Sequence, residues 1–175
     1  GLSSEICLID INNEKAKGEA MDIAQGTPYC SPVNIYAGDY PDAKDSNIVI
    51  ITSGIARKPG QSRLELAQIN VNILKSITEN IVKYAPDAIY IIVSNTVDVM
   101  TYAFAKFSGL PENQIIGSGT LLDTARLRAK IADNYSINPQ NVHALVLGEH
   151  GDSSFVPWAV STISNVPFEK YWDSV

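Results

Sequence analysis

The sequence has only two cysteines, no long hydrophobic run and no excess of positive charge, and each absence excludes a class of protein. Cys7 and Cys30 have neither C-x-x-C nor metal-ligand spacing, which is typical of free thiols in a reducing cytoplasm. The longest apolar stretch, at 89–93, is far too short for a membrane span. The net charge of −6 disfavours nucleic-acid binding, which requires basic surfaces. We therefore expect a cytoplasmic protein with no metal, no nucleic acid and no membrane partner.

The sequence also lacks an initiator methionine and a signal-peptide pattern. It opens with Gly1-Leu2-Ser3-Ser4 and enters an apolar run directly, which predicts a fragment that begins within a domain. Its 175 residues, 45% of them hydrophobic and 18% charged, are enough for a globular domain with a core.

Apolar runs alternate with segments of helical periodicity. The runs at 5–11, 47–53 and 88–94 are nearly continuous, as in strands buried on both faces of a parallel sheet. We expect shorter strands at 34–36, 114–117 and 143–147, and helices at 14–25, 64–84, 98–108 and 121–135. This alternation predicts an α/β fold, a doubly wound parallel sheet of the Rossmann-like type.

The segment 54–63 differs from its surroundings because it is polar and carries Arg57, Lys58 and Arg63. It directly follows the predicted strand 47–53, and ligands of open α/β sheets bind beyond the carboxyl ends of strands. A basic loop there could close over an anionic substrate. The alternative is an ordinary solvated connection.

His150 stands in Leu147-Gly148-Glu149-His150-Gly151, just after a predicted strand and between small residues that leave it accessible. A histidine can take a proton from an alcohol and return it to a ketone, although a lone histidine is more often structural. Asp123 and Arg126 begin a predicted helix and share a face. Asp123 could orient an imidazole and Arg126 could grip a carboxylate, or the two could be a helix cap and a surface charge.

Asp10 ends the first predicted strand. In dinucleotide-binding folds an acidic residue at the end of a strand bonds the ribose hydroxyls and disfavours NADP, although many strands simply end in Asp. The glycine-rich phosphate loop that precedes this position is absent from the sequence. If the dinucleotide interpretation is right, that loop and the first strand lie upstream of Gly1.

Four segments together resemble the lactate/malate dehydrogenase family: 53–66, 93–98, 117–128 and 147–153, in the family's order and spacing. The resemblance runs over essentially the whole chain. It implies an NAD-binding domain over 1–117 that lacks its first strand, followed over 118–175 by the beginning of an α+β substrate domain.

The resemblance also implies an oxidoreductase that transfers a hydride between NAD(H) and a 2-hydroxy/2-keto acid. His150 would be the proton donor and acceptor, Asp123 its orienting carboxylate, and Arg126 the group that binds the substrate carboxylate. Arg63 would polarise the substrate carbonyl on loop closure, and Asn95 would bond the substrate oxygen near the nicotinamide. The other cofactor-lining positions would be Asp10, Lys15, Tyr40, Gly54, Ile55, Ser76, Val93 and Ser118.

The choice between lactate and malate rests on two conflicting positions. Arg57, six residues before Arg63, is malate-like, because a second substrate carboxylate requires a cation. Glu149 before His150 is lactate-like, as are 63–66 and 119–123, so we favour lactate. Thr96 departs from the proline that the family has after Asn95 and that rigidifies this turn.

Arg128 and His143 resemble positions at which bacterial lactate enzymes bind the effector fructose 1,6-bisphosphate, although a surface arginine and a strand-end histidine are the alternative. The resemblance further implies a homotetramer acting in glycolysis and pyruvate fermentation. An inactive fragment or binding module that retains the fold is the alternative from another class.

Overall fold

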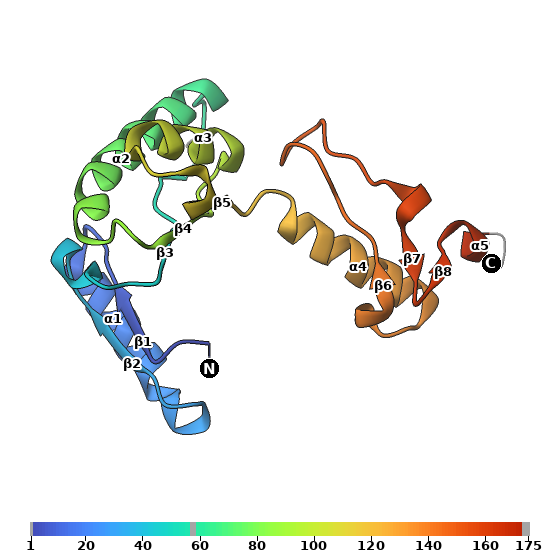
Figure 1. The fold of residues 1–175 in the computed structure, drawn as a ribbon, viewed down its shortest axis with the longest axis horizontal. Helices are drawn as coiled ribbons and strands as arrows, with labels where there is room; N and C mark the ends of the chain where they lie inside the picture. Colours follow the sequence, from blue (N-terminus) through green and yellow to red (C-terminus); the bar gives the residue numbers. More distant parts are fainter. Residues whose placement is uncertain (1, 57–58, 173–175) are drawn as a thin grey trace.

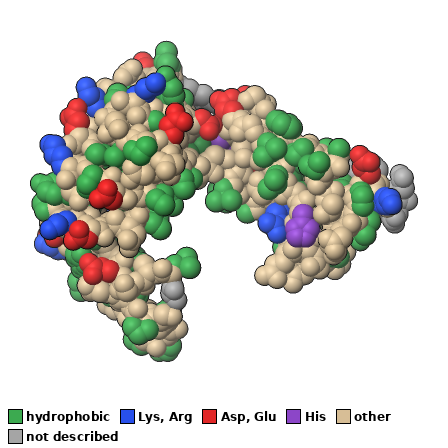
Figure 2. All heavy atoms as spheres, viewed as in Figure 1, with side chains coloured by type: hydrophobic (Ala, Val, Ile, Leu, Met, Phe, Trp, Pro, Cys, Tyr) green, Lys and Arg blue, Asp and Glu red, His purple; other side chains and the backbone are tan. Residues whose placement is uncertain are grey.

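The computed structural model describes residues 2–56 and 59–172, with the backbone alone at 63 and 172. The chain forms two lobes, an N-terminal lobe of residues 2–117 and a C-terminal lobe of residues 118–172 (Figure 1). A hollow separates the lobes except where they meet (Figure 2). Within the described residues no helix is long and apolar enough to cross a membrane.

The N-terminal lobe alternates strands and helices, which confirms the predicted α/β class. Its elements are β1 (Glu5–Leu8), α1 (Asn13–Gln25), β2 (Asn34–Ala37), β3 (Ile48–Ile51), α2 (Arg63–Tyr84), β4 (Ile89–Ile92), α3 (Val97–Ser108) and β5 (Ile115–Gly117). Single turns of 3-10 helix lie at η1 (Thr27–Tyr29), η2 (Tyr40–Ala43) and η3 (Glu112–Gln114). The helix and strand ends fall within three residues of those predicted.

All strands of this lobe pair in parallel, but they form two separate sheets. One sheet is β1-β2 and the other is β3-β4-β5. In a doubly wound dinucleotide-binding sheet the first strand lies between the second and the fourth. The gap between β1 and β3 is that position, in agreement with the prediction of a Rossmann-like sheet without its first strand.

The prediction that the long apolar strands are buried on both faces is wrong: no residue of β1 is buried, and β3 and β4 are buried on one face only. Their side chains alternate, so that Ile50 is 60% exposed while its neighbour Ile51 is 3% exposed. Ile48 and Ile89 are likewise exposed. Among the described residues, α2 and α3 pack on one face of this sheet, and the other face keeps its apolar side chains without a helix over them.

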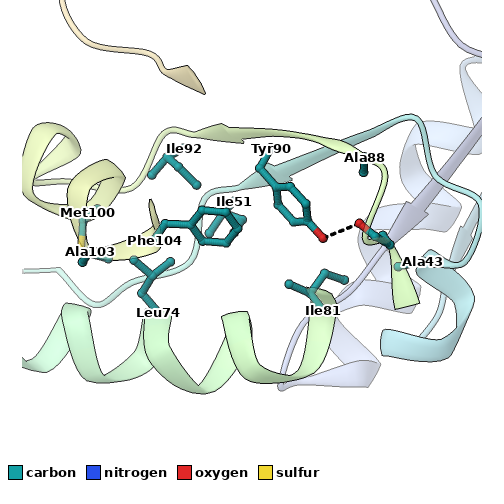
Figure 3. Close-up of a cluster of buried hydrophobic side chains, with 11 residues drawn as sticks. Ala43, Ile51, Leu74, Ile81, Ala88, Tyr90, Ile92, Met100, Ala103 and Phe104 are labelled. Carbon is teal, nitrogen blue, oxygen red and sulfur yellow. Dashed lines mark hydrogen bonds between the residues drawn. The ribbon is translucent and has the colours of Figure 1, made fainter. Parts of the chain in front are cut away.

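The core of the N-terminal lobe lies between β3, β4, α2 and α3 (Figure 3). Tyr90 is fully buried with its ring 4.8 Å from that of Phe104, and its hydroxyl donates to the carbonyl of Ala85 at 2.8 Å. Leu74 and Ile81 of α2 pack against the same cluster. This packing fixes β3 and β4 so that the loops at their carboxyl ends start from a rigid base.

The C-terminal lobe contains α4 (Leu121–Tyr135), the antiparallel strands β6 (Val142–His143), β7 (Thr162–Ile163) and β8 (Val166–Pro167), and α5 (Glu169–Trp172). The 3-10 turns η4 (Pro139–Asn141) and η5 (Trp158–Val160) belong to it as well. Its small core gathers Ile131, Val142, Ile163 and Phe168.

The predicted strand 143–147 is wrong beyond His143. Val146 donates its N–H to Thr124 Oγ1 at 2.9 Å, and its carbonyl accepts from Thr120 Oγ1 at 2.6 Å. Side chains of α4 and its N-cap thus replace the bonds of a strand ladder. Farther along, Leu147 pairs with Phe155 as an isolated bridge that closes a loop around His150.

Candidate active site

Most of the predicted cofactor positions lie just beyond the carboxyl ends of parallel strands, where open α/β sheets bind ligands. Lys15 and Ser76 are the exceptions, lying exposed in the first turn of α1 and in α2. The others follow successive strands: Asp10 after β1, Tyr40 after β2, Gly54 and Ile55 after β3, Val93 and Asn95 after β4, and Ser118 after β5.

Asp10 is exposed, and its Oδ1 accepts from the backbone N–H of Asn12 at 2.8 Å. Asn12 in turn caps α1 by accepting from the N–H of Lys15. The carboxylate therefore shapes the turn into α1 while remaining open to solvent, where it can accept from ribose hydroxyls. Tyr40 is partly buried against the main core, and this burial, followed by the charge of Asp39, raises the pKa of its phenol.

The loops after β3 and β4 are bonded to each other. The buried hydroxyl of Ser94 donates to the carbonyl of Ser53 at 2.7 Å. Thr96 stands at the N-cap of α3 without a side-chain capping bond, and the Asn95–Thr96 peptide is cis. The side chain of Asn95 itself is exposed beside this turn.

His150 and Asp123 are brought together although they are 27 residues apart. Nδ1 of His150 lies 2.6 Å from Oδ2 of Asp123, and the two side chains are 33% and 30% exposed. Arg126 Nη1 is 3.9 Å from Asp123 Oδ1, and its side chain is 69% exposed. The geometry can therefore orient an imidazole and leave a guanidinium facing solvent beside it.

The loop that carries His150 is held in shape by its neighbours. Gly148 has a φ of +93°, and a Cβ there would lie 3.2 Å from the carbonyl oxygen of Ser153, so glycine suits the position. Glu149 accepts from the hydroxyl of Ser153 at 2.8 Å. Asp98, at the start of α3, accepts from the backbone N–H of His150 at 2.8 Å and so ties the two lobes together.

The sequence did not single out four residues whose side chains bond to the backbone of predicted site segments. They are Asp98, Thr120, Thr124 and Asn70. Asn70 and Thr124 lie within helices, and Asp98 and Thr120 lie at helix starts, so the sequence offered no signal beyond polar residues at ordinary helical positions.

Two predicted residues cannot be placed from side-chain geometry. Arg57 lies outside the described residues. Arg63 is the first residue of α2, where Ser62 and Glu65 form a capping box, but its side chain is outside the description. In the part of the chain that is described, no three His, Cys, Asp or Glu side chains gather as a metal site.

Arg128 and His143 lie in α4 and β6 of the C-terminal lobe. Arg128 of α4 donates from Nη2 to the carbonyl of Pro139 at 3.4 Å. His143 is exposed in β6, which directly follows the turn begun by Pro139. The structure therefore attaches Arg128 to the segment that leads into His143.

The strand-end residues fit a dinucleotide by their chemistry. Asp10 offers acceptors for a ribose diol, while Ile55 and Val93 expose 40% and 42% of their apolar surface at strand ends, as flat rings require. At Gly54 a Cβ would approach the Asn70 amide to 3.3 Å, so glycine suits the close approach of this loop to α2.

Comparisons with known proteins agree with this geometry. Residues 1–117 match the family model of the lactate/malate dehydrogenase NAD binding domain, and residues 120–174 match that of the alpha/beta C-terminal domain. NAD is thus the cofactor of the matched domain. An L-lactate dehydrogenase of Clostridium botulinum is 48% identical over 98% of this chain, which covers 54% of that protein. The chain therefore spans about half the length of the curated relatives it matches.

Two solved structures share the fold over nearly all of this chain. A lactate dehydrogenase from a Medee basin deep-sea metagenome library superposes with a TM-score of 0.93 at 43% identity, with 98% of this chain and 55% of that one covered. The malate dehydrogenase of Picrophilus torridus superposes with a TM-score of 0.92 at 35% identity, over 96% and 54% of the respective chains. This chain belongs to the lactate/malate dehydrogenase family.

Proposed function

We propose that this chain is the part of an NAD-dependent L-lactate dehydrogenase that carries its proton donor and acceptor, His150. The observation that supports this most directly is the 2.6 Å contact between His150 and Asp123, with the exposed Arg126 beside it. An acid/base histidine, its orienting carboxylate and a carboxylate-binding cation are the groups that reduction of a 2-keto acid requires.

The roles follow from the atoms that each residue leaves available. When bound, NADH would supply the hydride that the carbonyl carbon of the keto acid accepts. Because Nδ1 of His150 is engaged by Asp123, Nε2 is the atom that gives a proton to the developing alkoxide. Arg126 pairs with the substrate carboxylate, and Asn95 donates to the substrate oxygen. Arg63 polarises the carbonyl when the loop 54–62 closes and excludes water.

Lactate is the favoured substrate because Glu149 precedes His150 and because a clostridial relative with 48% identity to this chain is an L-lactate dehydrogenase. Malate is the second candidate, supported by Arg57 and by the similarity to a malate dehydrogenase structure. The charge at residue 57 can be tested directly. If Arg57 adds affinity for a second carboxylate, Arg57→Gln lowers kcat/KM for oxaloacetate about tenfold or more and leaves pyruvate within about threefold.

The setting of the enzyme is part of the same proposal. We expect a cytoplasmic homotetramer of glycolysis and pyruvate fermentation, with fructose 1,6-bisphosphate bound near Arg128 and His143. A sugar-phosphate titration that leaves the KM for pyruvate unchanged in the full-length protein would remove the effector from the proposal.

The decisive experiment measures NADH oxidation by the full-length protein with pyruvate and oxaloacetate side by side. Higher kcat/KM with pyruvate supports the lactate enzyme, and higher kcat/KM with oxaloacetate moves the protein to malate. His150→Gln should abolish either activity, while Asp152→Asn on the same loop serves as the control. A folded full-length protein inactive with both acids would favour the binding-module alternative.

A further inference from the structure

Asn70 is a buried polar side chain in the interior of α2, where it is 3% exposed. Burying an amide without hydrogen-bond partners costs free energy, so the partners of the Asn70 amide indicate its role. Its hydrogen-bond partners are backbone groups of two loops outside the helix.

The two loops are those that follow β3 and β4. Asn70 Oδ1 accepts from the N–H of Ile55 at 2.9 Å, and Nδ2 donates to the carbonyl of Asn95 at 3.3 Å. A weaker contact joins Nδ2 to the carbonyl of Ile55 at 3.5 Å. One side chain therefore uses both its acceptor and its donor to bridge segments that lie 15 and 25 residues away.

The loop after β3 is shaped to allow this bridge. A Cβ at Gly54 would lie 3.3 to 3.4 Å from three atoms of the Asn70 amide, which is tight for a side-chain contact. At the far end of the same loop, Ser62 and Glu65 form the capping box that begins α2. Both ends of the loop 55–62 are thus anchored on α2, one by Asn70 and the other by the cap.

We propose that Asn70 is a positioning residue, which fixes the base of the substrate-closing loop at Ile55 and sets it against the turn that presents Asn95. This proposal rests on the proposed function, because the proposed function assigns catalytic roles to the loops after β3 and β4. Asn70 touches neither substrate nor cofactor in this assignment and acts through the backbone that it holds. Misplacing catalytic groups by about an ångström can lower a rate by about a hundredfold, so loss of the bridge should reduce turnover more than stability alone would.

The test compares three variants of the full-length protein. Asn70→Ala removes both hydrogen bonds, and Asn70→Asp keeps the acceptor for Ile55 but loses the donor to Asn95. Thr78→Val is the matched control, because Thr78 is also buried in α2 but its hydroxyl donates only within the helix, to Leu74 at 2.7 Å.

We expect Asn70→Ala to lower kcat/KM for the keto acid at least tenfold, while Thr78→Val leaves kcat/KM within about twofold. The deficit of Asn70→Asp relative to the unmodified protein should shrink as pH falls, because a protonated carboxyl regains the donor toward Asn95. If Asn70 only stabilised the fold, Asn70→Ala and Thr78→Val would not differ in kcat/KM, and the deficit of Asn70→Asp would not change with pH. Equal kinetic effects of Asn70→Ala and Thr78→Val would overturn the proposal.

Amide hydrogen exchange supplies a readout that does not depend on activity. In Asn70→Ala, the peptides that contain Ile55 and Asn95 should exchange faster, and in Thr78→Val they should not. If the unmodified protein reduces no keto acid, the proposed function fails while the exchange result still decides whether Asn70 holds the two loops. Unchanged exchange in both peptides would refute the bridge itself.

Discussion

Asp123→Asn is the perturbation that examines the predicted catalytic pair most directly. The substitution keeps the size of the side chain and an oxygen that can accept from His150 Nδ1, but it removes the negative charge 2.6 Å from the imidazole. In the proposed reaction the protonated imidazole of His150 donates its proton to the keto acid. Removing the charge that stabilises this imidazolium should therefore lower kcat for pyruvate reduction.

The magnitude follows from the contact and its exposure. A hydrogen bond to a charged partner contributes about 1.5–3 kcal/mol, and about 1.4 kcal/mol corresponds to tenfold in rate. Both side chains are about one-third exposed, so solvent screens part of the interaction and the lower half of that range applies. We therefore expect kcat to fall about tenfold to fortyfold.

The assay is steady-state NADH oxidation by the full-length protein at saturating pyruvate. Asp133→Asn is the matched control, because Asp133 lies on the same helix and pairs with Lys130 at 3.8 Å while being 80% exposed. It should leave kcat unchanged, since exposed ion pairs contribute little. A kcat for Asp123→Asn within twofold of the unmodified protein, with folding intact, would refute an electrostatic role for this carboxylate.

Three further predictions concern the core, the catalytic loop and the thiols. Tyr90→Phe removes a buried hydrogen bond to the end of α2 and should lower the free energy of unfolding by about 1 kcal/mol in urea denaturation, whereas no change would contradict that bond. Gly148→Ala should lower kcat, because the φ of +93° and the nearby carbonyl of Ser153 disfavour a side chain there. Gly109→Ala is the control, because Gly109 also has a positive φ but a Cβ there would meet open space, and it should leave kcat unchanged. Equal effects of the two substitutions on kcat would contradict this prediction. Burial, and secondarily nearby acidic charge, raises the pKa of Cys7, so iodoacetamide at pH 8 should modify it more slowly than the exposed Cys30, and the reverse order would argue against the burial.

The periodic segments were predictable because local sequence decides them. The apolar face of α2 and its Ser62–Glu65 capping box specify a helix whatever lies around it. The strand 143–147 was not predictable, because Thr120 and Thr124 take the backbone bonds of Val146 from a helix that lies elsewhere in the sequence. The prediction that β3 is buried on both faces was wrong for a similar reason. Whether a sheet face is buried depends on which helices pack against it.

For the candidate site, too, some features follow from the local sequence and others from tertiary packing. By itself the sequence determined the residue types, their order and the strand–loop positions of Asp10 and Asn95, because motif spacing and periodicity are properties of the chain. Only the tertiary structure decided that His150 meets Asp123 at 2.6 Å and Asp98 at 2.8 Å, and that Asn70 bridges two loops. Those contacts join residues far apart in sequence, and packing of separate elements, rather than any local preference, sets the distances between them.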